Sequence, residues 1–81
     1  MIKLTRSDPA RNMHRFYTLD VMPTLFGEWA VVAEWGRIGA PGKVQHRTFA
    51  DETAASSALV RRLTAKARRG YSESGSPQVG L

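Results

Sequence analysis

The chain has 81 residues, of which 42% are hydrophobic, and its 12 Lys and Arg against 7 Asp and Glu give a net charge of +5. This length allows one small domain with a small core, and it excludes a second domain, the larger enzyme folds and a deep substrate cleft. There is no cysteine, which excludes a disulfide framework and thiolate zinc sites. The excess of positive charge favours a polyanionic partner, and nucleic acid is the commonest one.

No targeting or membrane segment is recognisable in the sequence. The first six residues carry two charges and are followed by no apolar run of the kind found in signal peptides. The longest apolar run covers residues 29–33, whereas a transmembrane helix needs about 20 residues. We therefore expect a complete, cytoplasmic protein that does not contact a membrane.

Alternating apolar and polar residues predict strands in the first two thirds of the chain. Tyr17 and Leu19 fall on one face of such a segment, and Trp29 and Trp35 fall on one face of the next. Residues 6–12 show no such alternation and are expected to form a loop. The predicted strands cover residues 15–22, 28–35 and 43–49, with residues 2–5 as a candidate fourth.

A single helix is predicted between residues 51 and 69. Asp51 is suited to the N-cap position, and Gly70 is suited to the left-handed position just past the C-terminal end. Tyr71 would then fold back onto the helix. Apolar residues four positions apart form a stripe that should cover one face of the sheet, namely Ala55, Leu59, Leu63 and Ala67.

These elements predict an α+β fold, an antiparallel sheet of three to five strands with one C-terminal helix packed on one face. There is no internal repeat. We expect residues 1–71 to form a single domain. Residues 72–81 are rich in Ser, Gly and Pro, so a disordered C-terminal tail is expected there.

The tripeptide Trp35-Gly36-Arg37 lies in a wider pattern of aromatic and glycine residues. Over roughly residues 14–71, this pattern resembles the WGR domain, which is named for that tripeptide. Such domains occur in many poly(ADP-ribose) polymerases and in bacterial proteins. The other parts of the pattern are Tyr17-x-Leu19-x-Val21, Phe26-Gly27-x-Trp29, Ile38-Gly39, Phe49 and Gly70-Tyr71.

The resemblance implies an antiparallel sheet with a helix and a role in nucleic-acid binding. In the polymerases, the domain engages DNA near a break, with the Trp of the tripeptide against the end of a strand and the Arg linking DNA contact to neighbouring domains. By resemblance, these roles fall on Trp35 and Arg37. The chain has no room for the polymerases' catalytic domain or zinc fingers. Because it also shows no acid–base or nucleophile constellation, it is not expected to be an enzyme, and no cofactor is expected.

Trp35 and Arg37 each have two interpretations. Trp35 continues a stripe of apolar residues and could simply be core, or it could project at the rim of the sheet and stack on a sugar or base. Arg37 is expected in the loop between two strands, either solvated or acting as a bidentate phosphate ligand. Trp29 is interpreted as a core residue.

Three glycines punctuate the segment after the tripeptide. Their spacing does not match the dinucleotide-binding fingerprint. The loop also joins two predicted strands, whereas that fingerprint opens a helix. We interpret Gly36, Gly39 and Gly42 as turn and close-approach residues. Pro41 and Gly42 fit the central positions of a type II turn, with positive φ at Gly42.

The positive charges gather in the second half of the chain. Lys43 and Arg47 alternate to one side of a predicted strand and are candidate phosphate ligands beside Arg37. On the helix, cations at i, i+4 and i+7 share a face that is either simply solvated or part of a phosphate track. These helix residues are Arg62, Lys66 and Arg69.

No catalytic or metal-binding pattern is present in the sequence. His14 and His46 are the only histidines, and with no cysteine and no close carboxylate cluster they predict no zinc site. No Gly-x-Ser-x-Gly elbow occurs. Glu28 and Glu34 are interpreted as solvated sheet residues, because a glycosidase-like carboxylate pair would need a cleft.

The sequence therefore predicts a non-catalytic nucleic-acid-binding module that recognises ends, nicks or gaps through phosphate contacts and a stacking Trp. The resemblance favours DNA over RNA, although no motif addresses a ribose 2′-hydroxyl. The alternative is a protein-interaction or homodimerisation module that uses the same Trp and Arg edge, since aromatic residues and Arg also dominate protein interfaces.

Overall fold

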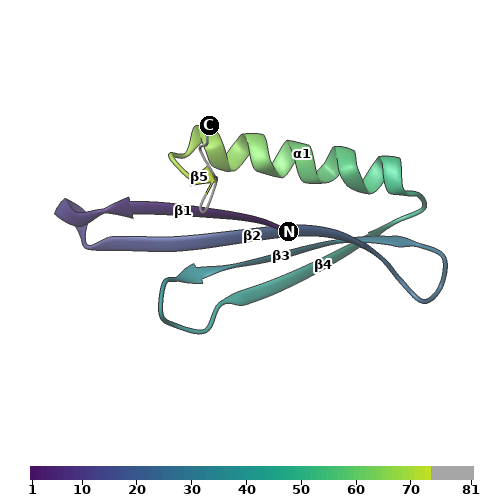
Figure 1. The fold of residues 1–81 in the computed structure, drawn as a ribbon, viewed down its shortest axis with the longest axis horizontal. Coiled ribbons are helices and arrows are strands. Elements are labelled where there is room, and N and C mark those ends of the chain that lie inside the picture. The colour runs from purple at the N-terminus through teal and green to yellow at the C-terminus, as the bar shows by residue number, and fades with distance from the viewer. Residues whose placement is uncertain (74–81) are drawn as a thin grey trace, which may run out of the picture.

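The computed structural model describes residues 1–73, and they form one sheet covered by one helix. Figure 1 shows the helix lying along the strands on a single face of the sheet. The elements are β1 (Ile2–Asp8), the 3-10 helix η1 (Pro9–Arg11), β2 (Met13–Pro23), β3 (Trp29–Arg37), β4 (Lys43–Phe49), α1 (Glu52–Arg68) and β5 (Ser72–Glu73).

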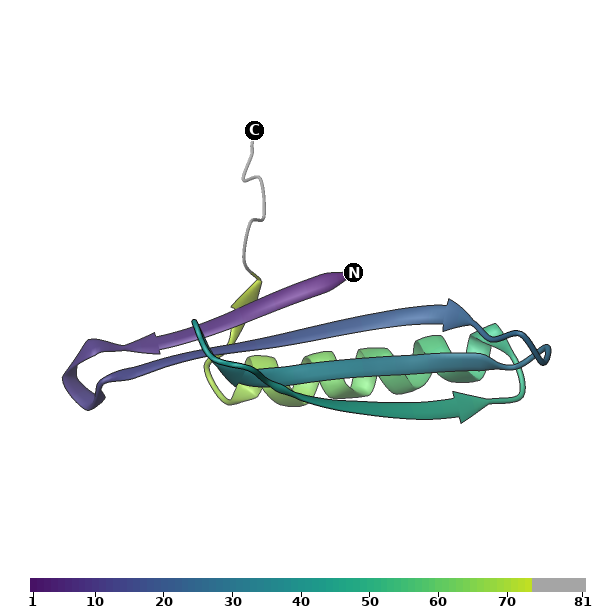
Figure 2. The ribbon, with the colours of Figure 1, turned by 90° about the horizontal axis from the view of Figure 1, so that it is seen from below.

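The five strands form one antiparallel sheet in the order β4-β3-β2-β1-β5, which confirms the predicted α+β class. Figure 2 shows the sheet from its uncovered side with α1 behind it. The first four strands are joined in chain order by hairpin connections, so each pairs with its sequence neighbour. The helix then brings β5 back to the outer edge of β1.

The predicted loop over residues 6–12 is wrong for its first three residues, because β1 continues to Asp8 and pairs with β2 throughout. The chain reverses later, through η1 with Pro9 at its start and Asn12 in the left-handed region at φ 52°. Arg6 and Ser7 are both polar, so the sequence shows no alternation there. Backbone pairing with β2 keeps these residues in the sheet.

Both helix ends are built as predicted. The backbone N–H of Ala54 donates to Oδ1 of Asp51 at 2.8 Å, so Asp51 is the N-cap. At the other end, Gly70 adopts φ +95°, and the N–H groups of Gly70 and Tyr71 donate to the carbonyl oxygens of Ala67 and Lys66. This pair of bonds is a Schellman motif, and it turns Tyr71 back onto the helix.

The core lies between α1 and the helix-side face of the sheet. Leu19 is fully buried at its centre, and Ala55 is the buried contact of the helix. Around them lie the half-buried Leu59 and Leu63 of the predicted stripe. The buried core residues are Leu4, Tyr17, Leu19, Val31, Ala33 and Ala55. Their alternation along the strands confirms the predicted inward faces, and Ala30 is the one further buried residue of the described strands, on the opposite face.

The turn after β3 differs from the prediction, because the positive φ belongs to Gly39 (+89°) and not to Gly42. The N–H of Ala40 donates to the carbonyl of Arg37 at 3.1 Å, so Gly39 occupies the third position of a four-residue turn. At Gly42 a side chain is excluded by close approach to the backbone, since a Cβ there would lie 2.6 Å from the carbonyl oxygen of Trp35.

Ser72 and Glu73, which the sequence assigned to a disordered tail, belong to β5 and pair with β1. The rest of that predicted tail, residues 74–81, lies outside the described residues.

Within residues 1–73, no helix is long and apolar enough to cross a bilayer.

Candidate nucleic-acid interface

The centre of the candidate site is a stacked pair of aromatic rings, Tyr17 on β2 and Trp35 on β3. The strand register places the two residues directly opposite each other. Their ring centroids are 5.7 Å apart and their planes differ by 16°. Tyr17 is only 4% exposed, whereas Trp35 is half-buried. Trp35 is therefore supported on one side by the core and keeps part of its indole at the surface.

The C-terminal half of α1 lays cations over this aromatic pair. Nζ of Lys66 lies 4.6 Å from the centroid of the Tyr17 ring and 5.9 Å from that of Tyr71. Arg62 donates from Nη1 to the Tyr17 hydroxyl at 2.8 Å and from Nη2 to the side-chain oxygen of Gln45. These contacts fix the direction of two cationic side chains relative to Trp35.

Two shallow hollows, each of about 460 Å³, meet at Trp35. The helix-side hollow lies between Trp35 and the cations of α1. The rim hollow lies beyond it, at the end of β3. The helix-side hollow is lined by Tyr17, Trp35, Gln45, Arg62, Ala65, Lys66 and Arg69, and the rim hollow by Arg15, Trp35, Gly36, Arg37, Lys43 and Tyr71.

Six of the seven candidate nucleic-acid-binding residues therefore gather around these hollows. Arg47 does not: it lines a neighbouring hollow, two residues beyond Gln45 on β4, which adjoins the helix-side hollow at Arg62. Arg37 lies elsewhere than expected, because β3 continues through the tripeptide and Arg37 is its last residue, paired with Arg15. Gly36 leaves the pairing intact, opposite Phe16.

Sequence reasoning missed four residues of the site. Tyr17 and Tyr71 were interpreted only as core and helix-end contacts, while Arg15 and Gln45 received no role. The aromatic spacing gave no sign of stacking, because the partner of Tyr17 depends on the length of the hairpin between β2 and β3. Arg15 was placed at the start of a predicted strand, but only the pairing with β1 and β3 shows that it lies beside Arg37.

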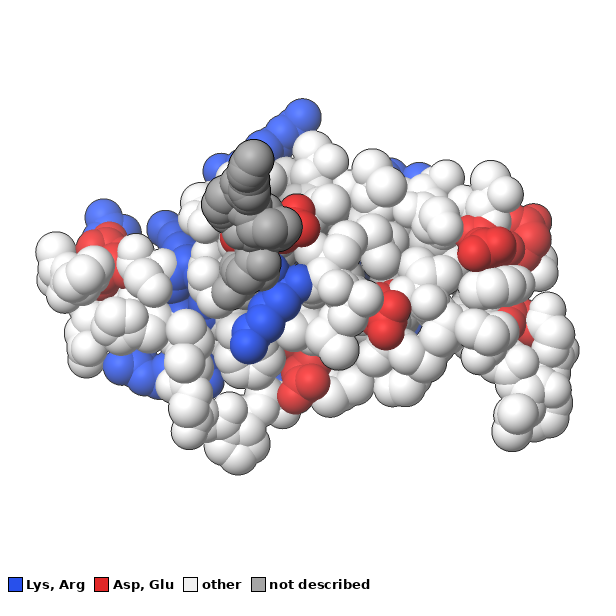
Figure 3. All heavy atoms as spheres, viewed as in Figure 1, with Lys and Arg blue, Asp and Glu red and all other residues white. Residues whose placement is uncertain are grey.

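The positive charges of the molecule are concentrated towards one end. On the face shown in Figure 3, most Lys and Arg lie on the half that holds the C-terminal end of α1, whereas Asp and Glu are spread along the face, with one group near the N-terminal end of α1. Asp51 and Glu52 begin the helix, and Lys66 and Arg68 end it. Both hollows therefore lie in the basic half, where the field attracts polyanions.

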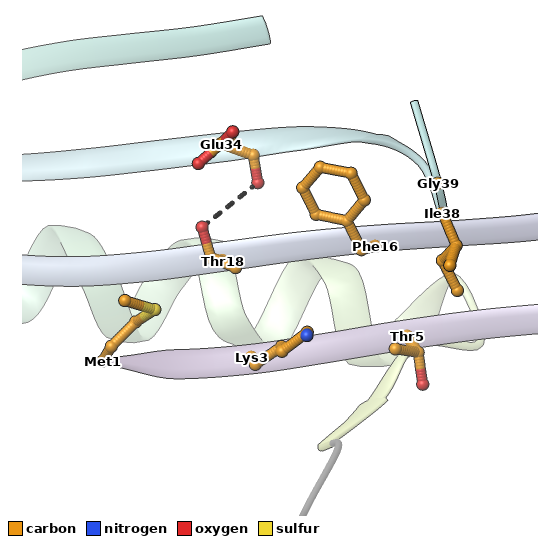
Figure 4. A pocket seen from close by; sticks show the side chains of 8 residues that line it. All are labelled: Met1, Lys3, Thr5, Phe16, Thr18, Glu34, Ile38 and Gly39. Atoms are coloured by element: carbon orange, nitrogen blue, oxygen red, sulfur yellow. Dashed lines mark hydrogen bonds between the residues drawn. The ribbon is translucent and has the colours of Figure 1, made fainter. Parts of the chain in front are cut away.

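The opposite, uncovered face of the sheet is chemically different. A hollow of about 580 Å³ lies there, and Figure 4 shows Phe16 and Thr18 of β2 at its floor. The Thr18 hydroxyl donates to the backbone carbonyl of Glu34 at 3.5 Å. Lys3 and Glu34 in this lining carry opposite charges, and the N-terminal ammonium of Met1 pairs with Asp20, so this face lacks the strong basic character of the helix side.

Partial burial and neighbouring cations lower the pKa of Lys66 below its usual value. Partial burial is the largest cause, followed by repulsion from Arg69 and then from Arg62. The lowered pKa means that the unfolded chain binds the proton more tightly. The free energy of unfolding therefore rises as pH increases from the pKa of folded Lys66 towards 10.5, because the folded protein no longer has to hold the charged form.

A bound polyanion should raise the pKa of Lys66 again, because phosphate groups favour the charged form. The measurement is an NMR titration of the Lys66 side chain at low salt, with and without a short hairpin duplex. Affinity for the duplex should fall as pH rises from the pKa of Lys66 in the free protein to its higher pKa in the complex. The Lys3 resonances, from the opposite face, serve as control and should not move when duplex is added. An unchanged Lys66 pKa would place the ligand elsewhere.

Within the described part of the chain, no group of three or more His, Cys, Asp or Glu lies close enough to hold a metal ion. His14 is half-buried at the start of β2, and His46 is exposed on the uncovered face of β4. What the site offers chemically is an aromatic surface ringed by guanidinium and ammonium groups, which suits stacking and phosphate binding.

Comparison with known proteins points to one family. The family model for the WGR domain matches residues 1–78. An uncharacterised protein, y4dW, of Sinorhizobium fredii (strain NBRC 101917 / NGR234) is 39% identical over 66 residues, which cover 82% of this chain and 32% of the relative. The chain thus spans about a third of that relative's length. No solved structure matches. The chain belongs to the WGR domain family, a binding module associated with nucleic acids rather than a catalytic domain.

Proposed function

We propose that this protein is a non-catalytic, cytoplasmic DNA-binding module that recognises ends, nicks or gaps. One observation carries the proposal: Trp35 lies stacked on Tyr17 where two hollows meet, with Arg37 and Lys43 on one side and helix cations on the other. A partly exposed indole beside cations is an arrangement suited to binding an unpaired base or sugar together with its phosphates.

In this proposal Trp35 provides the stacking surface. Arg37 and Lys43 would contact the backbone phosphates on the rim side. Arg62, Lys66 and Arg69 would contact them on the helix side, and Arg47 would extend the contacts along β4. Arg62 already donates to Tyr17 and Gln45, so its remaining N–H groups are those free for phosphate. Such contacts position the ligand but read little sequence.

The ring of cations and the single aromatic surface predict a preference for structure over sequence. The test compares a nicked duplex carrying a 5′-phosphate with a hairpin-closed duplex of the same sequence, by fluorescence anisotropy over a series of salt concentrations. We expect the nicked probe to bind more tightly and both affinities to fall steeply with salt, through release of counterions.

Equal binding of the two probes would mean that the protein binds DNA through its positive charge without preferring a break, and it would overturn break recognition. An RNA version of the nicked probe tests the preference for DNA. Absence of binding at low salt would overturn the nucleic-acid proposal as a whole. Size-exclusion chromatography would then show whether the Trp35 edge is occupied by a second copy.

A further inference from the structure

Three arginines on three neighbouring strands form a row across the sheet. Arg15 on β2 pairs directly with Arg6 on β1 and with Arg37 on β3. Paired residues of antiparallel strands project on the same side, with Cβ atoms about 4.5–5.5 Å apart. We call Arg6, Arg15 and Arg37 the arginine row. It lies two residues along the strands from the pair formed by Tyr17 and Trp35, on the same face of the sheet.

The row faces the helix side of the sheet, next to the candidate site. Arg15 and Arg37 line the rim hollow together with Trp35. Arg6 is turned towards the end of α1, since a Cβ at Gly70 would lie 3.4 Å from its Nε. The negative end of the helix dipole favours a cation there, which gives Arg6 a local partner. Arg15, in the middle, stands between two like charges.

This arrangement costs stability in the free protein, because like charges directly opposite each other on a sheet repel. Within residues 1–73, no carboxylate lies within ion-pair distance of the row. Among residues 1–73 the ion pairs are those of the N-terminus with Asp20 and of Arg11 with Asp8, and neither includes a member of the row. Arg15 and Arg37 are exposed, so both guanidinium groups are accessible to a ligand.

We propose that the arginine row binds the phosphodiester backbone of the nucleic acid beyond the nucleotide at Trp35. The backbone would then cross the strands at the rim of the sheet, from β3 towards β1. This inference rests on the proposed function and adds Arg6 and Arg15 to the site. The phosphates would neutralise the repulsion within the row, and the planar guanidinium forks are suited to them.

The decisive variant is Arg15→Thr, which removes the central charge and keeps a residue that favours strands. Affinity for the nicked duplex should fall about tenfold, and the slope of log affinity against log salt should become shallower by about 0.9. The midpoint of thermal unfolding at low salt, without nucleic acid, should stay the same or rise. A purely structural role for Arg15 would lower it.

The matched control is Lys3→Thr, the same loss of charge on the neighbouring strand but on the uncovered face. It should lower affinity much less than Arg15→Thr does. If the two variants bind equally, the arginine row is overturned, while binding by the wild type keeps the proposed function intact. If Arg15→Thr lowers the unfolding midpoint, Arg15→Lys decides: reduced affinity with an unchanged salt slope supports the row, and wild-type affinity overturns it.

Discussion

Trp35→Ala is expected to lower affinity for a nicked duplex by about 10- to 100-fold, because stacking on one base contributes roughly 1–3 kcal/mol. The salt dependence should stay that of the wild type, since the change removes no charge. Preference over the hairpin-closed duplex should disappear. Fluorescence anisotropy with both probes, at several salt concentrations, measures all three quantities.

Trp29→Ala provides the matched control for this experiment. Trp29 begins the same strand on the same face and is half-buried, but it pairs with Phe49 and lines neither hollow at Trp35. Its truncation should destabilise the fold and leave the folded protein's affinity unchanged. Trp35→Ala binding like the wild type would refute the stacking role, and equal losses in both variants would mean that the core, not a stacking surface, was disturbed.

The fold was predictable wherever a period or a cap identifies an element. Alternation fixed the inward face of β2 and β3, since Tyr17, Leu19 and Ala33 are buried as expected. The helix limits followed from two local signals, the carboxylate of Asp51 and the left-handed Gly70. Such signals act within one turn of chain, so the sequence displays them directly.

The ends of β1 and β2 were not predictable by the same means. Residues 6–8 are polar on both faces, and Met13 is the single apolar side chain in residues 13–14, so no alternation separates strand from loop there. Pairing holds them in the sheet, and pairing depends on where η1 reverses the chain. The arginine row became visible only with this register, because Arg6, Arg15 and Arg37 are nine and 22 residues apart along the chain.

Only part of the candidate site could be predicted from the sequence, for a related reason. Helical spacing placed Arg62, Lys66 and Arg69 on one face, and the structure sets that face over Trp35. The connection between the two parts is Tyr17, which touches both through its ring and its hydroxyl. Residues 45 or more positions apart meet there, and a linear pattern gives no sign of such a contact.

Tyr17→Ala is expected to cost about 3–5 kcal/mol of the free energy of unfolding, as for other buried aromatic residues. The change removes the support of Trp35, the edge contact with Tyr71 at 6.2 Å and the partner of Arg62. For a domain of this size that is a large part of the whole stability. Urea unfolding followed by tryptophan fluorescence measures it.

Tyr17→Phe separates the two roles of this residue. It keeps the ring and removes the hydroxyl that accepts from Arg62, so stability should fall by only about 1 kcal/mol. Leu19→Ala, two residues along the same buried face, should lose about 2–5 kcal/mol without touching either hollow. Its folded form should therefore bind like the wild type. If Tyr17→Phe binds more weakly than Leu19→Ala despite its greater stability, the hydroxyl positions Arg62 for the ligand. If both bind like the wild type, Tyr17 serves the site through its ring alone.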